Sequence, residues 1–417
     1  MSQELPSFLA PEEVTAIAEQ FGTPVFVYDK ATLRHQADEA LAFSAPYGLT
    51  VRYAMKANPN KHILDTFQEA GVVVDASSGY EAERALLAGF DPEDILITSQ
   101  ELPKNLEELI EKGVEFDACS LHQLETYGKS FPGTTVGVRI NPGLGSGHSN
   151  KTNVGGPASS FGIWHEHTDR IHEIAEQYDL TIGRVHTHIG SGADPAIWAK
   201  AAQLSLDHVR AFPDVTTLNL GGGFKVARMD HEVSTDIGVV GKVVAESLEE
   251  FCEETERRIH LEIEPGTFMV ANAGALITTV ADKVDTGEEG YEFLKVDSGM
   301  TDILRPSLYG AQHPMTVVNE RSENPTDYVV VGHCCESGDL LTPVPGDAES
   351  LATRTLQQAE IGDHLIIGGV GAYCASMNAH GYNSFPETAA VMKHLDGSIT
   401  QIAARGTLQA LLKNELA

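Results

Sequence analysis

The sequence predicts an α/β protein in which a (β/α)8 barrel is followed by an all-β C-terminal domain. Short apolar runs alternate with amphipathic helical patterns from residue 50 to 265, which is typical of a parallel sheet. After about residue 270 the apolar runs are separated by turns, with few helical patterns between them. The length of 417 residues suits two domains. An open, doubly wound sheet is the alternative for the first part.

Eight apolar runs make up the predicted barrel, and eight is the strand number of a closed (β/α)8 architecture. The runs are TVRYAM (50–55), GVVVDA (71–76), DILITS (94–99), EFDACS (115–120), TTVGVRI (134–140), IGRVHTHI (182–189), VTTLNL (215–220) and HLEIE (260–264). We expect the barrel at residues 31–270 and the β-domain at residues 271–417. A further strand-like run, TPVFVYD, lies in an N-terminal segment, residues 1–30, that we expect to pair with the β-domain.

The composition argues against several kinds of partner. The chain carries 60 acidic and 28 basic residues, a net charge of −32, so its surface repels nucleic acid and anionic membranes. No apolar stretch of about 18 residues is present, and the N-terminus does not resemble a signal peptide. Five irregularly spaced cysteines do not suggest a disulfide framework. We therefore expect a cytoplasmic protein with a small-molecule substrate and no nucleic-acid or membrane partner.

Polar side chains and glycines follow several predicted barrel strands at their C-terminal ends, where the site of such a barrel forms. Lys56 follows the first run. The last three runs continue into HTHIGSG, LNLGGGF and EIEPGT, which contain His186, His188, Ser191, Gly221, Gly222, Gly223, Glu262, Glu264, Gly266 and Thr267. A lysine, an imidazole, a glycine triplet and a carboxylate would therefore meet at one mouth of the barrel.

Each of these groups suits one part of the same ligand. Glycines let backbone N–H groups approach a phosphate, and a carboxylate can hold a proton on a pyridine nitrogen. An imidazole can lie flat on an aromatic ring, and a lysine amine can bond covalently to an aldehyde. Pyridoxal 5'-phosphate (PLP) has all four features. The combination predicts a PLP-binding barrel.

Simpler interpretations exist for each motif alone. Lys56 could be a surface lysine at a strand end, the glycine triplet a turn, and Glu264 a salt-bridge partner. His186 and His188 face the same side of a strand and could bind zinc, but no third ligand follows at a useful spacing, so we expect no metal. GSGHSNKT (145–152) departs from a phosphate-binding loop because asparagine precedes the lysine.

Longer motifs resemble the fold-III PLP decarboxylases, which combine an alanine-racemase-like barrel with a β-domain. The barrel motifs are YAMKAN, HTHIGSG, LGGGF and EPG. Further motifs resemble the diaminopimelate decarboxylases, enzymes of the last step of lysine biosynthesis. These are RINPGLGSGHSNKTNVGGPASSFGIW (139–164), VDSGMTDILRPSLYGAQHP (296–314), CCESGDLL (334–341) and GAYCASMNAHGYNSFP (371–386).

The resemblance implies a role for each matching residue. Lys56 would bind the cofactor covalently, His188 would stack on its ring, and Glu264 would pair with the ring nitrogen. The residues that the resemblance places around the phosphate are Ser191, Gly223, Gly266, Thr267 and Tyr373. Those that it places at the substrate are Arg305, Tyr309, Glu336 and Tyr373. Cys335 would return a proton to the substrate, and Cys335 and Glu336 would reach the other subunit's site in a homodimer.

The chain departs from the family pattern at two positions. Thr267 stands where the family has an arginine after EPG that contacts the substrate's distal carboxylate, and Phe385 stands where the family has another arginine. Threonine cannot supply a charged, bidentate contact with a carboxylate. We expect decarboxylation of meso-2,6-diaminopimelate to L-lysine and CO2. The alternatives are a decarboxylase of D-ornithine or D-lysine, an amino-acid racemase, a non-enzymatic PLP-binding protein and a metal-binding module.

Overall fold

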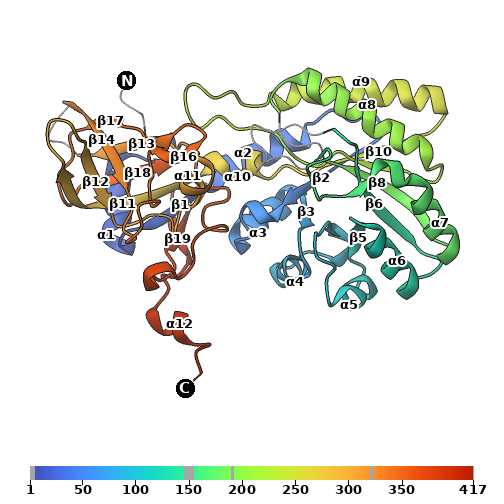
Figure 1. Ribbon diagram of the computed structural model, residues 1–417, viewed down its shortest axis with the longest axis horizontal. Coiled ribbons are helices and arrows are strands. Elements are labelled where there is room, and N and C mark those ends of the chain that lie inside the picture. The colour runs from blue at the N-terminus through green and yellow to red at the C-terminus, as the bar shows by residue number, and fades with distance from the viewer. Residues whose placement is uncertain (1–4, 145–154, 189–191, 320–323, 417) are drawn as a thin grey trace. The chain divides into compact units, whose positions relative to one another are not determined.

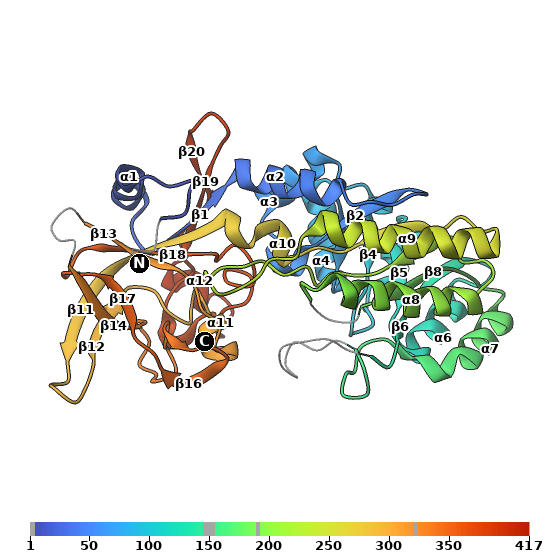
Figure 2. The same cartoon turned by 90° about the horizontal axis from the view of Figure 1, so that it is seen from above.

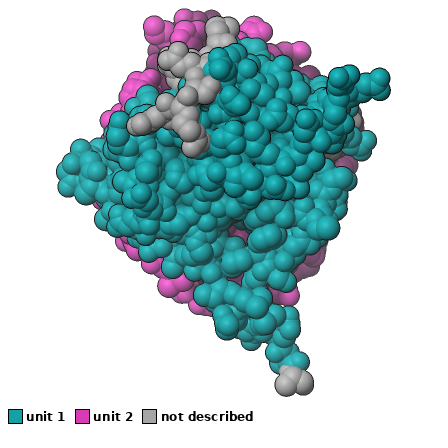
Figure 3. Space-filling model, turned by 90° about the vertical axis from the view of Figure 1, so that its left-hand side faces the viewer, with its two compact units in different colours: residues 1–33, 227–232, 270–417 teal, residues 34–226, 233–269 magenta. Residues whose placement is uncertain are grey.

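The structure, a computed structural model, describes residues 5–144, 155–188, 192–319 and 324–416. The chain forms two compact units. Unit 1 consists of Met1–Leu33, Ala227–Glu232 and Val270–Ala417, and unit 2 consists of Arg34–Val226 and Val233–Met269. In the face that Figure 3 shows, the described parts of unit 1 form one continuous surface. No helix within the described ranges is long and apolar enough to cross a membrane.

Unit 2 is a closed barrel of eight parallel strands (Figure 1). The strands are β2 (Leu49–Ala54), β3 (Val73–Ala76), β4 (Ile95–Ile97), β5 (Glu115–Ala118), β6 (Thr135–Asn141), β8 (Thr181–Thr187), β9 (Thr217–Asn219) and β10 (His260–Ile263). Their order is β5-β4-β3-β2-β10-β9-β8-β6, and pairing of β5 with β6 closes the barrel. The predicted barrel is confirmed, and the open-sheet alternative is wrong. The short strand β7 (Ile163–Trp164) pairs with the last two residues of β6, Ile140 and Asn141.

Helices follow the barrel strands and cover the outside of the barrel. They are α2 (Lys30–Leu41), α3 (Lys61–Ala70), α4 (Gly79–Ala88), α5 (Leu106–Glu111), α6 (Leu121–Ser130), α7 (Thr168–Tyr178), α8 (Pro195–Ala211), α9 (Ile237–Thr255) and α10 (Thr267–Val270). Several begin at a side chain that accepts a backbone hydrogen bond, among them Asn60 before α3, Ser78 before α4 and Ser120 before α6. Helices α8 and α9 lie side by side in both ribbon views (Figures 1 and 2).

Unit 1 is mostly sheet, as the sequence predicts for the C-terminal region. Its strands are β1 (Val25–Asp29), β11 (Gly274–Asp285), β12 (Glu292–Val296), β13 (Met315–Val318), β14 (Pro325–Val331), β15 (Pro343–Val344), β16 (Asp347–Leu351), β17 (Arg354–Gln357), β18 (His364–Gly368), β19 (Ala389–Lys393) and β20 (Ile399–Ala403). The main sheet has the order β17-β14-β12-β11-β1-β19-β20, and β18 pairs with β11 and β13. In Figure 2, β1 lies next to β19, and β20 follows on the other side of β19.

The N-terminal part of the chain completes unit 1. Strand β1 runs antiparallel to β11 and parallel to β19. Helix α1 (Pro11–Phe21) packs its apolar side on this sheet, where Val14 and Ile17 join a buried core with Val25, Ile277 and Val391. Two short helices, α11 (Arg305–Tyr309) and α12 (Leu408–Leu412), lie later in unit 1.

Candidate active site

Glu264 directly follows β10 and is buried inside the barrel, with 4% of its surface exposed. Asn219, at the end of the neighbouring strand β9, donates from Nδ2 to Oε1 of Glu264 at 2.6 Å. The same asparagine accepts at Oδ1 from the backbone N–H of Gly221 at 2.8 Å. Burial and the nearby negative charge of Asp75 raise the pKa of Glu264 well above its ordinary value. The carboxyl is thus fixed in place, and the positive charges near it are too weak to offset its burial.

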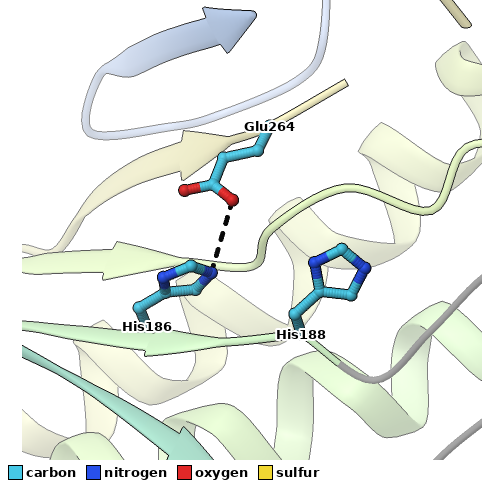
Figure 4. A group of neighbouring side chains, drawn as sticks. All are labelled: His186, His188 and Glu264. Carbon is cyan, nitrogen blue, oxygen red and sulfur yellow. Dashed lines mark ion pairs between the residues drawn. The ribbon is translucent and has the colours of Figure 1, made fainter. Parts of the chain in front are cut away.

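His186 lies between Glu264 and a second buried carboxylate. Figure 4 shows its contact with Glu264. Its Nε2 lies 3.4 Å from Oε2 of Glu264, and its Nδ1 lies 3.3 Å from Oδ2 of Asp117. The imidazole has no exposed surface, and burial lowers its pKa well below the ordinary value. Burial also raises the pKa of Asp117 to about 6. His186 is therefore a neutral ring between two carboxyl groups in the barrel interior.

An ion-pair network fills the layer of the barrel interior below Glu264. Arg52 Nη2 lies 2.9 Å from Oε1 of Glu262 and 2.6 Å from Oε2 of Glu115. Arg184 Nη2 lies 2.7 Å from the same oxygen of Glu115. Burial alone would raise the pKa of Glu262, but the two guanidinium charges outweigh it and the pKa is lowered. Glu262 therefore belongs to the core of the barrel and not to its mouth.

His188 and the glycine triplet after β9 form one wall of the mouth. Gly221 has a φ of +67°, and a Cβ there would lie 2.8 Å from Nδ1 of His188. A Cβ on Gly222 would lie 2.3 Å from the backbone oxygen of Glu264. Glycine is therefore required at both positions, because a side chain would displace the imidazole or the last barrel strand. The predicted convergence of His188, Glu264 and this triplet holds in the structure.

Lys56 lies in a short 3-10 helix, Met55–Ala57, at the end of β2. Its side chain is exposed, whereas Met55 and Ala57 on either side are buried. Its positive charge nevertheless acts on the mouth, because it lowers the pKa of Glu264 against the opposing effect of burial. Lysine and carboxylate therefore belong to the same end of the barrel.

Two charged residues of this mouth were missed by the sequence analysis. Asp75, on β3, is 1% exposed, and burial raises its pKa while the charge of Lys56 opposes the rise. Arg139, on β6, is 8% exposed, and its guanidinium lies 5.1 Å from the centre of the Phe161 ring. The available signal was a single charged residue inside an apolar strand, in VVVDA and in VGVRI. Such residues face the barrel interior and meet groups from other strands.

The remaining barrel residues of the prediction lie at the ends of β9 and β10, which are neighbouring strands. The backbone oxygen of Gly223 accepts from the N–H of Gly192 at 3.2 Å. Gly266 is buried, and Thr267 begins α10. Ser191 lies outside the described residues, as does the whole GSGHSNKT segment (145–152).

The other predicted site residues belong to unit 1. Arg305 and Tyr309 are the first and last residues of α11. Tyr373 has a φ of +57°, a left-handed conformation that is uncommon for a residue with a side chain. Cys335 is exposed, and its backbone N–H donates to Oδ1 of Asn383 at 2.8 Å.

Glu336 and Phe385 show how the surrounding loops of unit 1 are held. Oε2 of Glu336 accepts from the hydroxyl of Tyr382 at 3.4 Å. Phe385 stacks on the ring of His333 with centroids 3.6 Å apart and planes 5° apart. This ring pair joins the loop at Phe385 to the segment that follows β14.

The structure corrects one argument made from the sequence about metals. A third potential ligand does accompany the two histidines, because His186, His188 and Glu264 each offer an atom within 4.8 Å of the others. Such a group can bind a metal ion in principle. His186, however, already lies between two carboxyl groups, and the other groups of the mouth suit an aromatic phosphate ligand.

Comparisons with known proteins decide between these ligands. Residues 31–271 match the family model described as "Pyridoxal-dependent decarboxylase, pyridoxal binding domain". Diaminopimelate decarboxylase of Streptomyces coelicolor is 37% identical over 424 aligned positions, which cover 99% of this chain and 93% of the relative. The chain belongs to the diaminopimelate decarboxylase family.

Solved structures of this family have the same fold. A crystal structure of diaminopimelate decarboxylase has a TM-score of 0.92 and 33% identity, covering 100% of this chain and 99% of that chain. The Helicobacter pylori enzyme in complex with L-lysine has a TM-score of 0.85 and 26% identity, covering 96% of this chain and 98% of that one. Family membership makes this protein a PLP-dependent decarboxylase, and it disfavours the racemase, the non-enzymatic PLP-binding protein and the metal-binding module.

The barrel mouth fits the cofactor of the family. A buried carboxyl whose pKa is raised calls for a cationic partner, and a protonated pyridine nitrogen is such a partner. Glycines at 221 and 222 leave no side chain between His188 and the backbone of Glu264, and an imidazole can lie flat on an aromatic ring. The exposed amine of Lys56 can reach an aldehyde. These three features support PLP binding independently of the comparisons.

Proposed function

We propose that the protein removes CO2 from meso-2,6-diaminopimelate and releases L-lysine, as the last step of lysine biosynthesis. The observation that carries the proposal is similarity over nearly the whole chain to diaminopimelate decarboxylases, joined to a barrel mouth that fits PLP. Decarboxylation of D-ornithine or D-lysine is the alternative, and it is not favoured by these relatives.

In the proposal, the barrel at residues 31–270 holds the cofactor. PLP supplies an electron sink for the charge left on the α-carbon when CO2 departs. Lys56 anchors the cofactor through Nζ, and His188 covers one face of its ring. Glu264 holds a proton at the ring nitrogen, and the hydrogen bond from Asn219 keeps its carboxylate oriented. Asp75 and Glu264 together give the mouth enough negative charge to favour that proton.

The phosphate and the substrate are bound by further residues. We assign the phosphate to Ser191, Gly223, Gly266, the amide of Thr267 and the hydroxyl of Tyr373. We assign the substrate to Arg305, Tyr309, Glu336 and Tyr373. Cys335 delivers a proton from its thiol to the α-carbon after CO2 has left. An exposed thiol can act as a general acid.

The proposal includes a homodimer in which Cys335 and Glu336, from the β-domain at residues 271–417, complete the site of the other subunit. The proposal assigns residues 1–30 to that β-domain, which is supported by the pairing of β1 with β11 and β19. We place the enzyme in the cytoplasm, where its five free cysteines would remain reduced.

The test is CO2 release by the PLP-loaded protein on four substrates, namely meso-diaminopimelate, D-lysine, D-ornithine and L-ornithine. We expect the highest kcat/KM with meso-diaminopimelate and stoichiometric L-lysine. A higher kcat/KM with any monocarboxylate would overturn the proposal. Lys56→Ala is expected to abolish turnover and covalent PLP binding, whereas Lys104→Ala, an exposed lysine of the same unit, should leave both unchanged.

A further inference from the structure

Arg228 lies in the short segment Ala227–Glu232. This segment belongs to unit 1, although the residues before and after it in the sequence belong to the barrel unit. Nε of Arg228 donates to the backbone oxygen of Gly369 at 2.8 Å. Its aliphatic stem packs on the same residue, which has a φ of +65° and whose Cβ would lie 2.9 Å from Cγ of Arg228. Nη2 is shielded from solvent and has no hydrogen-bond partner. The guanidinium is thus held firmly while one of its ends lacks an acceptor.

A second arginine, Arg305, is connected through His313 to Gly368, the residue before Gly369. Arg305 contacts Nε2 of His313 through Nη1 at 3.1 Å, and Nδ1 of His313 lies 3.0 Å from the backbone oxygen of Gly368. A carbonyl oxygen can only accept, so Nδ1 carries the proton and Nε2 accepts from Arg305. Burial and the charges of Arg305 and Arg228 lower the pKa of His313 well below its ordinary value, which agrees with a neutral ring. Gly368 and Gly369, at the end of β18, therefore anchor two arginines.

The guanidinium groups of Arg228 and Arg305 form no ion pair with a carboxylate in the described part of the chain. The nearby Glu232 instead accepts from the backbone N–H groups of Arg228 and Met229, at 2.7 and 3.2 Å. Burial and the charge of Arg305 lower the pKa of Arg228 to about 9. Two neighbouring guanidinium groups are costly to bury unless an anion joins them.

The strongly negative charge of the chain makes two arginines without an ion pair unexpected. The chain has 60 acidic residues and a net charge of −32. Carboxylates that could pair with an arginine are therefore common in this protein. Two half-buried, neighbouring arginines without an ion pair, one of them with a shielded Nη2 that lacks an acceptor, indicate a site for an anionic ligand. The chain also lacks the two family arginines, with Thr267 and Phe385 in their places. A substrate with two carboxylates still needs a positive partner for the one that does not react.

We propose that Arg228, together with Arg305, binds the distal carboxylate of the substrate and so replaces the arginines lost at positions 267 and 385. Arg228 is then a specificity-determining residue for dicarboxylic amino acids. This inference rests on the proposed function, and it assigns recognition of the substrate's second carboxylate to Arg228. Nη2 of Arg228 supplies one donor, and the guanidinium of Arg305 supplies the others, so that the carboxylate receives the charge-assisted hydrogen bonds that such recognition requires.

The test compares two ligands that differ by one carboxylate. L-lysine retains the distal carboxylate of the substrate, whereas cadaverine, its decarboxylated form, lacks it. Binding of each to the PLP-loaded enzyme is measured by calorimetry for wild type, Arg228→Met and, as a control that removes one exposed positive charge, Arg258→Met. We expect Arg228→Met to weaken L-lysine binding by roughly 10- to 100-fold and cadaverine binding by less than about threefold. Arg258→Met should change neither.

The outcomes separate this inference from the proposed function. If wild type releases L-lysine from meso-diaminopimelate while Arg228→Met binds L-lysine normally, the function stands and the role of Arg228 is overturned. Equal weakening of both ligands would mean that Arg228 only supports the fold, and would also overturn it. Arg228→Lys retains the charge and the stem but loses the planar fork. Should the methionine variant fail to fold, selective weakening of L-lysine in the lysine variant supports the inference, and unchanged binding contradicts it.

Discussion

The imidazole of His186 lies against the carboxylate of Glu264, with Nε2 3.4 Å from Oε2, and both side chains are enclosed by the barrel. On its other side the same ring meets Asp117. A neutral imidazole has a single N–H and can donate to only one carboxyl at a time. It therefore spaces two acids that would otherwise repel each other, and it helps to fix the group that meets the cofactor ring.

Replacement of His186 by phenylalanine should weaken PLP binding without unfolding the barrel. The phenyl ring keeps the volume but removes both nitrogens, so each of the two buried carboxyl groups loses a polar neighbour and keeps only its other partner, Asn219 for Glu264 and Arg184 for Asp117. We expect the PLP Kd, measured by cofactor absorbance, to rise about tenfold or more. His186→Gln, which retains a donor and an acceptor, should lose less. His172→Phe, at an exposed histidine, is the control, and a similar loss there would contradict the argument.

Asp302 should make the protein less stable as the pH rises from about 4 to about 7. Its buried carboxyl accepts from the hydroxyl of Thr388 at 2.5 Å, but burial raises its pKa from 3.8 to about 6. The folded state then binds more protons than the unfolded state in this window, so the free energy of unfolding falls with rising pH. The difference of about 2 pKa units corresponds to roughly 3 kcal/mol.

Urea unfolding at pH 4, 5, 6 and 7 tests this for wild type and Asp302→Asn. Asparagine does not titrate, so the wild type should lose stability relative to the variant as the pH increases, most steeply below pH 6. Asp327→Asn, at an exposed position, should run parallel to wild type. A constant difference between wild type and Asp302→Asn would show that Asp302 does not hold its proton in the folded state.

Gly222→Ala should damage both the fold and cofactor binding. The new Cβ would lie 2.3 Å from the backbone oxygen of Glu264. This oxygen cannot move unless the main chain after β10 moves with it. We expect the free energy of unfolding to fall by about 1–3 kcal/mol, together with weaker PLP binding. Gly238→Ala is the matched control, because its nearest neighbour, Oδ1 of Asp236, lies at an ordinary 3.5 Å. Equal effects of the two substitutions would refute the clash.

The barrel could be predicted from the sequence because its strands are short apolar runs that recur at regular intervals. Lys56, His188 and Glu264 were found because they stand directly at the ends of such runs, and the ends of parallel barrel strands share one rim. No information beyond local pattern and known architecture was needed for these positions.

The buried polar groups could not be predicted in the same way. His186 and Asp75 lie inside strands, and their partners come from other strands that are distant in sequence. The pattern also gave no reason to single out Arg228, whose environment is created by the turn at Gly368 and Gly369, about 140 residues later in the chain. The exposure of Lys56 depends on a 3-10 turn that the apolar run does not encode.

Mixed dimers of Lys56→Ala and Cys335→Ala chains should recover activity that neither variant has alone. If each site uses Lys56 from one subunit and Cys335 from the other, a mixed dimer contains one intact site and one doubly defective site. Selection of the mixed dimers leaves one intact site of two in every dimer, so the preparation should reach about half of the wild-type rate. Activity is measured as CO2 release after co-expression and purification through tags on both chains.

A second pair provides the control. Lys56→Ala and Glu264→Gln both damage the barrel of their own chain, so their mixed dimer has no intact site and should remain inactive. Recovery in this pair as well would point to exchange of whole barrels or contamination. Failure of the first pair to recover would assign Cys335 to its own subunit's site. Full turnover by Cys335→Ala homodimers would instead show that its thiol does not deliver the proton.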